Sequence, residues 1–276
     1  MLTTLIPPSG GSASILDYDL RTQARRIREK IGVVQQQDSF DQGLKVEKCM
    51  DIYGLIWDMP ANERRKRITE LVERFGMDEF RKKQTIDLSA GQRRRLQVAR
   101  EFMHDMDLLF LDEPTVGLDP IARRSVLNYF KEKVEKEGLT IFFTTHILEE
   151  AEYLCQRIAI INHGKIIEID SPENLKRRFG RAKAVEFKLS EGMSAQLSTE
   201  LERSDSITKI VQDQENGSYK ISTLKPELVI PEVYRISDRL GLHISSIYVS
   251  ETTLEDAFVS LVGNSNEEIV RQGAQS

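Results

Sequence analysis

Short apolar runs alternate with helix-like segments along the first two thirds of the chain. The run LLFL at 108–111, and IFF within TIFFTT at 140–145, are apolar on consecutive positions. This pattern is typical of strands covered on both faces of a parallel sheet. Further strand-like runs lie at 31–35 and 157–162, and helical periodicity occurs at 46–77, 88–104, 121–137 and 148–155. Strands that alternate with helices predict a mostly parallel α/β sheet.

The pattern changes after residue 180. Predicted strands at 185–189, 207–211, 219–222 and 244–249 surround predicted helices at 195–203 and 232–240. The resulting order, β-α-β-β-α-β, is the split βαβ arrangement. We therefore expect a first domain at 1–180, a small accessory α+β domain at 181–263 and a flexible polar tail at 264–276.

Composition narrows the setting in which the chain works. Lys and Arg number 39 and Asp and Glu number 44, so the formal net charge is −5. This mild acidity gives no support for nucleic acid as a partner, since phosphate backbones require a basic surface. No apolar run approaches the roughly 20 residues that span a bilayer. The two isolated cysteines make no metal pattern, and a reduced, cytoplasmic setting fits best. Any membrane role must therefore come from a partner.

An acidic pair follows the first apolar run, in the segment LLFLDEPTVGLDP at 108–120. A parallel strand at 108–111 delivers Asp112 and Glu113 to the carboxyl edge of the sheet, where α/β folds bind ligands. Asp112 is suited to Mg²⁺, and Glu113 to polarising a water that attacks a phosphate. Taken alone, the pair also fits a strand end followed by acidic helix-capping residues.

The segment LSAGQRRRLQVAR at 88–100 predicts a helix with a capping box. Ser89 and Gln92 have the S-x-x-Q spacing, and Gly91 lets a ligand approach the backbone closely. A free helix amino terminus attracts phosphate, although a plain capping box needs no ligand. We expect the three arginines at 93–95 to lie on a solvated helix face.

Two further polar residues follow predicted strands. His146 comes directly after TIFFTT, in position to contact a phosphate and the water near Glu113. Gln36 follows the strand IGVVQ and has the chemistry to bind Mg²⁺ or water. A histidine at a strand end is commonly structural, and a loop glutamine alone is weak evidence.

These four segments, in this order and with these spacings, resemble the ABC-type ATPases. LSAGQ resembles the family signature LSGGQ, with Ala90 as a mild departure, and LLFLDEP resembles the Walker B motif. VGLDP resembles the D-loop, with Asp119 at its core. His146 matches the switch histidine, and Gln36 is the best match to the Q-loop glutamine. The resemblance covers residues 1 to about 180.

The resemblance implies a P-loop NTPase core with a helical subdomain, and ATP and Mg²⁺ as cofactors. It makes Glu113 and His146 the catalytic residues and assigns Asp112 and Gln36 to the metal. The residues it assigns to the nucleotide are Gln36, Ser89, Gly91, Gln92 and Asp119. In this family the signature helix acts on ATP held by an opposing subunit, so the resemblance implies a homo- or heterodimer.

One family motif is missing from the chain. The phosphate-binding loop G-x-x-x-x-G-K-[ST] does not occur, and we expect the core to be truncated at its amino end. The strand before that loop would bury about five apolar side chains at roughly 2 kcal/mol each, or about 10 kcal/mol. This is comparable to the whole stability of a domain, about 5–15 kcal/mol. We expect the chain alone to fold poorly and to hydrolyse ATP feebly or not at all.

The carboxyl-terminal segment narrows the subfamily. TLEDAFVSLVG at 253–263 resembles the tail of ATPases from drug-resistance (daunorubicin-type) exporters. The resemblance implies an ATP-hydrolysing subunit that drives export through a separate membrane permease, on the inner face of the cell membrane. The alternative is a regulatory subunit, catalytically impaired, that supplies only its signature motif to a partner. A soluble ABC protein acting on ribosomes or DNA fits the exporter-like tail less well.

Overall fold

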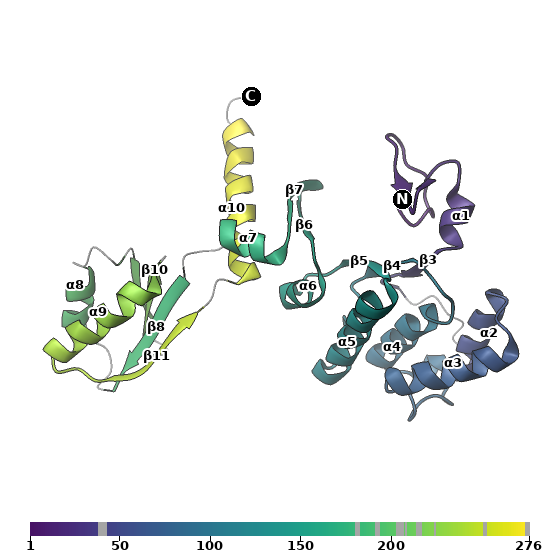
Figure 1. The fold of residues 1–276 in the computed structure, drawn as a ribbon, viewed down its shortest axis with the longest axis horizontal. Helices are drawn as coiled ribbons and strands as arrows, with labels where there is room; N and C mark the ends of the chain where they lie inside the picture. The colour runs from purple at the N-terminus through teal and green to yellow at the C-terminus, as the bar shows by residue number, and fades with distance from the viewer. Residues whose placement is uncertain are drawn as a thin grey trace. The chain divides into compact units, whose positions relative to one another are not determined.

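The protein is described from a computed structural model. The described residues are 1–37, 43–179, 183–190, 194–202, 207, 209–213, 217–223, 225–250 and 253–273. The chain divides into two compact units, Met1–Glu150 and Ala151–Ser276. Figure 1 shows the helices and strands of both units.

The first unit is built on a three-stranded parallel sheet in the order β3-β4-β5. Its strands are β3 (Ile31–Val34), β4 (Leu108–Asp112) and β5 (Thr140–Thr144). The register places Leu111 opposite Phe143 and Asp112 opposite Thr144. All three strands therefore end at one edge of the sheet, and the loops that follow them lie together there. The four leucine and phenylalanine positions of β4 are buried, as its continuous apolar sequence predicts.

Helices cover this sheet and form a bundle beside it. They are α1 (Ala24–Arg28), α2 (Val46–Ile56), α3 (Ala61–Arg74), α4 (Ala90–Glu101) and α5 (Pro120–Glu137). Helix α6 (Leu148–Leu154) begins in this unit and ends in the second. A small hairpin, β1 (Ser14–Ile15) and β2 (Tyr18–Asp19), and the 3₁₀ turn η1 (Thr85–Asp87) complete the elements. Helix α4 packs against β3, and α5 packs against β5 (Figure 1). Pro60 separates α2 from α3, because proline starts a helix readily and interrupts one in its interior.

Strand β5 differs from the prediction made for it. Its apolar sequence predicts a strand buried on both faces, yet its side chains are exposed or half-buried, and Phe142 is 52% exposed. Position at an edge of the sheet does not explain this exposure, since β3 is the other edge strand of the described sheet and is buried or half-buried. Helices α1 and α4 both pack against β3, whereas the helix that packs most against β5 is α5. The prediction of burial is wrong because a strand is buried only where other elements cover its faces.

The second unit contains a hairpin and a separate antiparallel sheet. The hairpin joins β6 (Ile158–Asn162) to β7 (Lys165–Asp170) through His163 and Gly164, both with positive φ as its tight turn requires. The sheet has the order β11-β8-β10-β9. Its strands are β8 (Lys183–Leu189), β9 (Lys209–Asp213), β10 (Ser218–Thr223) and β11 (Ile244–Ser250), with helices α8 (Ala195–Glu202) and α9 (Pro226–Arg239) between them. The predicted order β-α-β-β-α-β is confirmed.

This sheet has a hydrophobic core of its own. Phe187 on β8 and Tyr219 on β10 stack with their ring centroids 4.9 Å apart, and α8 and α9 contribute further buried leucines and valines. Helix α7 (Pro172–Phe179) packs against α10 (Leu254–Gly273). The backbone of α10 is helical over most of the segment for which a tail is expected, and residues 274–276 lie outside the described part.

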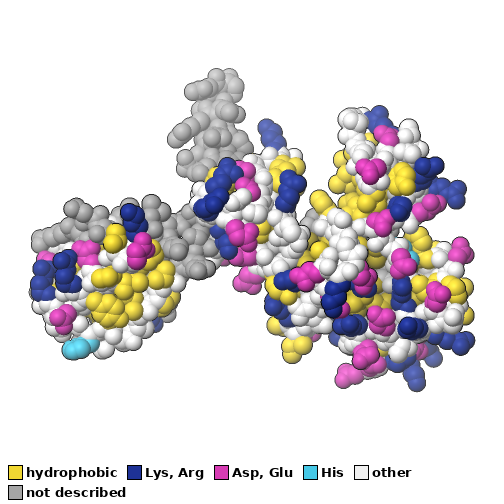
Figure 2. All heavy atoms as spheres, in the orientation of Figure 1, with side chains coloured by type: hydrophobic (Ala, Val, Ile, Leu, Met, Phe, Trp, Pro, Cys, Tyr) yellow, Lys and Arg dark blue, Asp and Glu magenta, His cyan; other side chains and the backbone are white. Residues whose placement is uncertain are grey.

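Two surface properties bear on partners. None of the described helices is long and apolar enough to cross a membrane. Figure 2 shows basic and acidic side chains interspersed over the face that it presents, without a large patch of one sign.

Candidate active site

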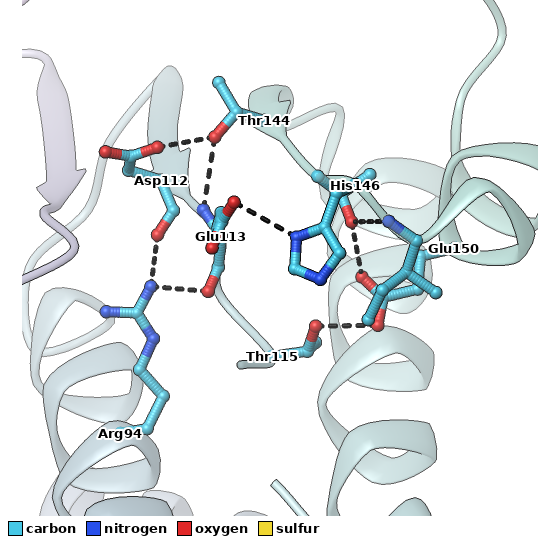
Figure 3. A network of polar contacts seen from close by, with 9 residues as sticks. Arg94, Asp112, Glu113, Thr115, Thr144, His146 and Glu150 are labelled. Atoms are coloured by element: carbon cyan, nitrogen blue, oxygen red, sulfur yellow. Dashed lines mark hydrogen bonds and ion pairs between the residues drawn. The ribbon is translucent and has the colours of Figure 1, made fainter. Parts of the chain in front are cut away.

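Asp112 and Glu113 lie where β4 ends, and Thr144 at the end of β5 ties them in place. The Thr144 hydroxyl donates to Oδ1 of Asp112 at 2.6 Å. It accepts from the backbone N–H of Glu113 at 3.2 Å, and the Thr144 carbonyl accepts from the same N–H at 3.2 Å. One side chain of the edge strand therefore orients the carboxylate of Asp112 and the backbone of Glu113 together (Figure 3).

The backbone of Glu113 is held in an unfavourable conformation. Its φ is +47°, in the left-handed region that residues other than glycine adopt uncommonly. Such a residue costs about 1–3 kcal/mol and persists only where its surroundings fix it. Here Thr144 binds its N–H, and Arg94 of α4 donates to its carbonyl at 2.7 Å. The conformation turns the chain away from the strand and leaves the Glu113 side chain at the sheet edge.

His146 faces Glu113 across this edge. Its Nδ1 lies 3.1 Å from Oε1 of Glu113, and the side chain of His146 is 66% exposed whereas that of Glu113 is 28% exposed. A carboxylate oxygen only accepts hydrogen bonds, so with Glu113 ionised we assign the proton to Nδ1. Nε2 of His146 is then an acceptor, available to a group that carries a proton.

Gln36 follows β3 and lines a cleft of about 640 Å³ at the same edge of the sheet. Asp112 and Thr144 line this cleft too, and its remaining wall is mainly apolar, with Phe110 and Phe142 from β4 and β5. The structure thus brings together the ends of β3, β4 and β5 with Gln36, Asp112, Glu113 and His146, the four residues that the sequence indicates.

A buried carboxylate joins the turns on either side of Glu113 and His146. Glu150 of α6 is 2% exposed. Its Oε1 accepts from the hydroxyl of Thr115 at 2.7 Å, and its Oε2 accepts from the hydroxyl of Thr145 at 3.2 Å (Figure 3). The guanidinium of Arg123 lies 3.5 Å from Oε1. Glu150 therefore fixes the turn after Glu113 to the turn that contains His146.

The signature segment forms a capped helix start beside the turn that precedes α5. Ser89 accepts from the N–H of Gln92 at 3.2 Å, and the Gln92 side chain accepts from the N–H of Ser89 at 3.1 Å. The predicted capping box is therefore present, and Ser89 is exposed. A Cβ at Gly91 would lie 2.7 Å from the carbonyl oxygen of Gly117, so only glycine fits this close approach.

Asp119 caps the following helix. Its carboxylate accepts from the backbone N–H groups of Ile121 at 3.1 Å and Ala122 at 2.9 Å. These bonds, the Ala122 bond foremost, hold the pKa of Asp119 below its usual range. Ser89, Gly91, Gln92 and Asp119 thus share one region of the unit, while the described side-chain hydrogen bonds of Ser89 and Gln92 run to each other rather than to the Asp112–Glu113 pair.

Several residues of the site were missed by the sequence interpretation. Arg94 is not on a solvated face, as the sequence led us to expect, but is 6% exposed. Helical spacing does not single Arg94 out, because residues 96–101 of the same helix are all buried. Thr144 and Glu150 carry no signal either, because their roles depend on contacts between strands and turns distant in sequence.

The donor set at the sheet edge fits Mg²⁺ with a nucleotide phosphate. Mg²⁺ is usually held by one or two protein oxygens together with water and phosphate oxygens. The carboxylate of Asp112 and the amide oxygen of Gln36 supply such ligands in one cleft. The described residues contain no cluster of three or more His, Cys, Asp or Glu side chains of the kind that forms an all-protein metal site.

Comparison with known proteins agrees with this geometry. Residues 1–116 match the family model described as ABC transporter. The chain is 27% identical to the linearmycin resistance ATP-binding protein LnrL of Bacillus subtilis (strain 168), over 95% of this chain and 84% of that protein. It is 30% identical to the daunorubicin/doxorubicin resistance ATP-binding protein DrrA of Streptomyces peucetius, over 96% of this chain and 79% of that protein. The chain belongs to the ABC transporter ATP-binding proteins.

The structural comparison supports the fold. The dimeric, post-hydrolysis structure of the ATP-binding cassette MJ0796 bound to ADP and Pi matches with a TM-score of 0.57 and 24% identity. The match covers 61% of this chain and 76% of the cassette. The predicted P-loop NTPase fold of the ABC type is confirmed, and the chain is an ABC-type, nucleotide-binding ATPase of the drug-resistance subfamily.

Proposed function

We propose that this chain is the ATP-hydrolysing subunit of an ABC exporter, with Glu113 as the residue that activates water. The observation that carries the proposal is the contact between Glu113 and His146 at 3.1 Å, formed beside Asp112 at the carboxyl edge of a parallel sheet. Such an edge is where α/β folds bind their ligands.

Glu113 and His146 act on the water that attacks the terminal phosphate. The carboxylate of Glu113 accepts a hydrogen bond from the attacking water and polarises it toward the terminal phosphate. His146 orients that carboxylate through Nδ1 and offers Nε2 to the water or to a protonated phosphate oxygen. The left-handed turn at Glu113 keeps this carboxylate directed to the sheet edge, separate from that of Asp112.

Asp112 and Gln36 are the residues that would hold Mg²⁺. When bound with ATP, the ion neutralises phosphate charge and orients the terminal phosphate. Thr144 contributes by fixing Oδ1 of Asp112, so the carboxylate need not reorganise when the cation arrives. Gln36 is exposed in the loop after β3, where its side chain is free to reorient toward the cation.

Ser89, Gly91, Gln92 and Asp119 belong to a different part of the cycle. They form an exposed, capped helix start and the adjoining turn, and a helix amino terminus favours an anion. The related cassette MJ0796 is dimeric, and we propose that these residues complete the nucleotide site of a second subunit. The drug-resistance names of LnrL and DrrA support export through a membrane permease, to which this chain would bind at the inner face of the membrane.

Steady-state ATP hydrolysis by the purified chain, with and without Mg²⁺ and its permease, tests the proposal. In the complex with the permease we expect hydrolysis that requires Mg²⁺ and a loss of about 100-fold in His146→Ala. The chain alone, in which the loop G-x-x-x-x-G-K-[ST] does not occur, should hydrolyse ATP feebly or not at all. His163→Asn is the matched control, because His163 lies in the β6–β7 turn. Hydrolysis that is independent of Mg²⁺, or full activity in His146→Ala, contradicts the proposal. A chain that joins the complex without hydrolysing ATP would favour the regulatory alternative.

A further inference from the structure

Arg94 uses its whole guanidinium group inside the first unit. Nε donates to the carbonyl of Pro114 at 3.1 Å. Nη1 donates to the carbonyl of Gln35 and to the side-chain oxygen of Gln97, both at 2.7 Å. Nη2 donates to the carbonyls of Asp112 and, at 2.7 Å, Glu113. A guanidinium has five N–H groups in a rigid fork, and here five acceptors meet them.

The acceptors belong to three segments of the candidate active site. Three consecutive carbonyls come from the turn that carries Asp112 and Glu113, and one comes from the strand end before Gln36. Arg94 itself stands on α4, five positions after the helix cap Ser89. One side chain therefore connects the signature helix, the turn after β4 and the loop that contains Gln36. Figure 3 shows its bonds to the carbonyls of Asp112 and Glu113.

A neighbouring side chain adds to the same connection. Gln97 is fully buried on α4, and its Nε2 donates to the carbonyls of Gln35 at 2.9 Å and Gln37 at 2.7 Å. The segment before and after Gln36 is thus bound to α4 through its backbone, which leaves the Gln36 side chain exposed for a ligand.

The conformation of Glu113 explains why this connection matters. A left-handed glutamate relaxes unless bonds on both sides of it hold it. Thr144 holds the N–H of Glu113, and Arg94 holds its carbonyl together with those of the residues before and after it. A shift of α4 therefore moves the carbonyls on which the direction of the Glu113 side chain depends.

We propose that Arg94 is a positioning residue of the hydrolytic site, which makes the signature helix, the Glu113 turn and the Gln36 segment move as one body. Only the expected effect of Arg94 on ATP hydrolysis rests on the function proposed above. Arg94 touches no substrate in this role; it acts by keeping Glu113 and Gln36 in register with each other.

Arg94→Lys tests the proposal, because lysine keeps the charge but has three donors for five acceptors. Arg95→Lys is the matched control on the same helix, since Arg95 donates to the carbonyls of Phe75 and Gly76 at the end of α3. We expect kcat for ATP to fall about 10- to 100-fold in Arg94→Lys, with KM unchanged. Arg95→Lys should keep both values.

Hydrogen exchange of the whole chain gives a readout that does not require hydrolysis. We expect the amides of 113–118 and 33–37 to exchange faster in Arg94→Lys, while both segments stay as in the wild type in Arg95→Lys. Thermal unfolding, measured alongside, separates this local change from a loss of folded protein.

The outcomes distinguish this proposal from the function on which it draws. If the wild-type chain proves inactive but both segments still exchange faster in Arg94→Lys, the result would support the role of Arg94 and count against the ATPase assignment. Unchanged exchange at both segments, or a loss of activity that follows the unfolded fraction alone, would overturn the role of Arg94. A raised KM with unchanged kcat would overturn it too.

Discussion

Strands β4 and β5 are neighbours of equal length with similar apolar sequences, yet they differ in how they are anchored. LLFL of β4 is buried between β3 and β5, whereas TIFFT of β5, an edge strand of the described sheet of the first unit, is exposed or half-buried. The carboxylates Asp112 and Glu113 come from the well-anchored strand. Their partners Thr144 and His146 come from the poorly anchored one.

The difference shows what holds this site together. Since packing alone does not fix the end of β5, polar bonds across the two strand ends do so. Thr144 binds Asp112 and Glu113 directly, and Glu150 joins the turns behind them through Thr115 and Thr145. The site depends on burial on the β4 side and on hydrogen bonds on the β5 side.

The largest expected effect is a loss of stability, and it is tested by comparing one variant of each strand. Leu109→Ala on β4 should lower the free energy of unfolding by about 3 kcal/mol, because Leu109 is fully buried and leaves a cavity. Phe142→Ala on β5 should cost below about 1 kcal/mol, since half of that side chain is already exposed. Urea unfolding of both variants measures the pair. Equal losses would contradict the difference in anchoring.

The buried carboxylate gives the next effect. Glu150→Gln should destabilise the chain by about 1–3 kcal/mol, because it removes the charge near Arg123 and an acceptor from a buried network. Glu149→Gln, at the exposed neighbouring position, is the control and should change unfolding by less than about 0.5 kcal/mol. If both variants unfold alike, Glu150 does not join the two turns.

A smaller effect is expected where β5 meets the carboxylates. Thr144→Val keeps the shape of the side chain but removes its bonds to Asp112 and Glu113, and should cost about 1 kcal/mol. ATP hydrolysis should fall about tenfold, in proportion to the loss of that orienting bond. Thr140→Val, at the other end of the same strand, should hydrolyse ATP like the wild type. Full activity in Thr144→Val would show that the Thr144 hydroxyl does not orient Asp112 and Glu113 for hydrolysis.

The smallest expected effect is a change in the free energy of unfolding with pH, caused by the buried His104. His104, after α4, is buried against Trp57 with ring centroids 3.9 Å apart, and burial lowers its pKa below the usual 6.5. Below pH 6.5 the unfolded chain then binds a proton that the folded chain does not, so stability falls as the pH is lowered from 6.5 toward the folded pKa.

His104→Phe provides the comparison. It keeps a ring against Trp57 but does not titrate, so its free energy of unfolding should change less between pH 7.5 and 5.5, both about one unit from 6.5. Denaturant curves at the two pH values measure this difference. The same slope in the variant and the wild type would show that His104 does not titrate as described.

The sequence predicts the order of elements and the four residues at the sheet edge because both follow from local patterns. Apolar runs placed β3, β4 and β5, and the polar residues directly after them had to lie at one edge of a parallel sheet. The sequence does not predict the exposure of β5, since burial depends on which elements cover the faces of a strand. It does not reveal Arg94 or Glu150 either, because their partners are backbone carbonyls and hydroxyls from distant segments.

The residue at the centre of the account is Glu113, and Glu113→Gln tests it most directly. The amide keeps the size of the side chain and the left-handed turn, so nucleotide binding should stay as in the wild type. The amide is a far weaker base than the carboxylate, so it should not activate water. Single-turnover hydrolysis of ATP with Mg²⁺, measured in the complex with the permease, should fall by about 100- to 10,000-fold. Hydrolysis at the wild-type rate in Glu113→Gln, with normal binding, would contradict the assignment of this carboxylate as the group that activates water.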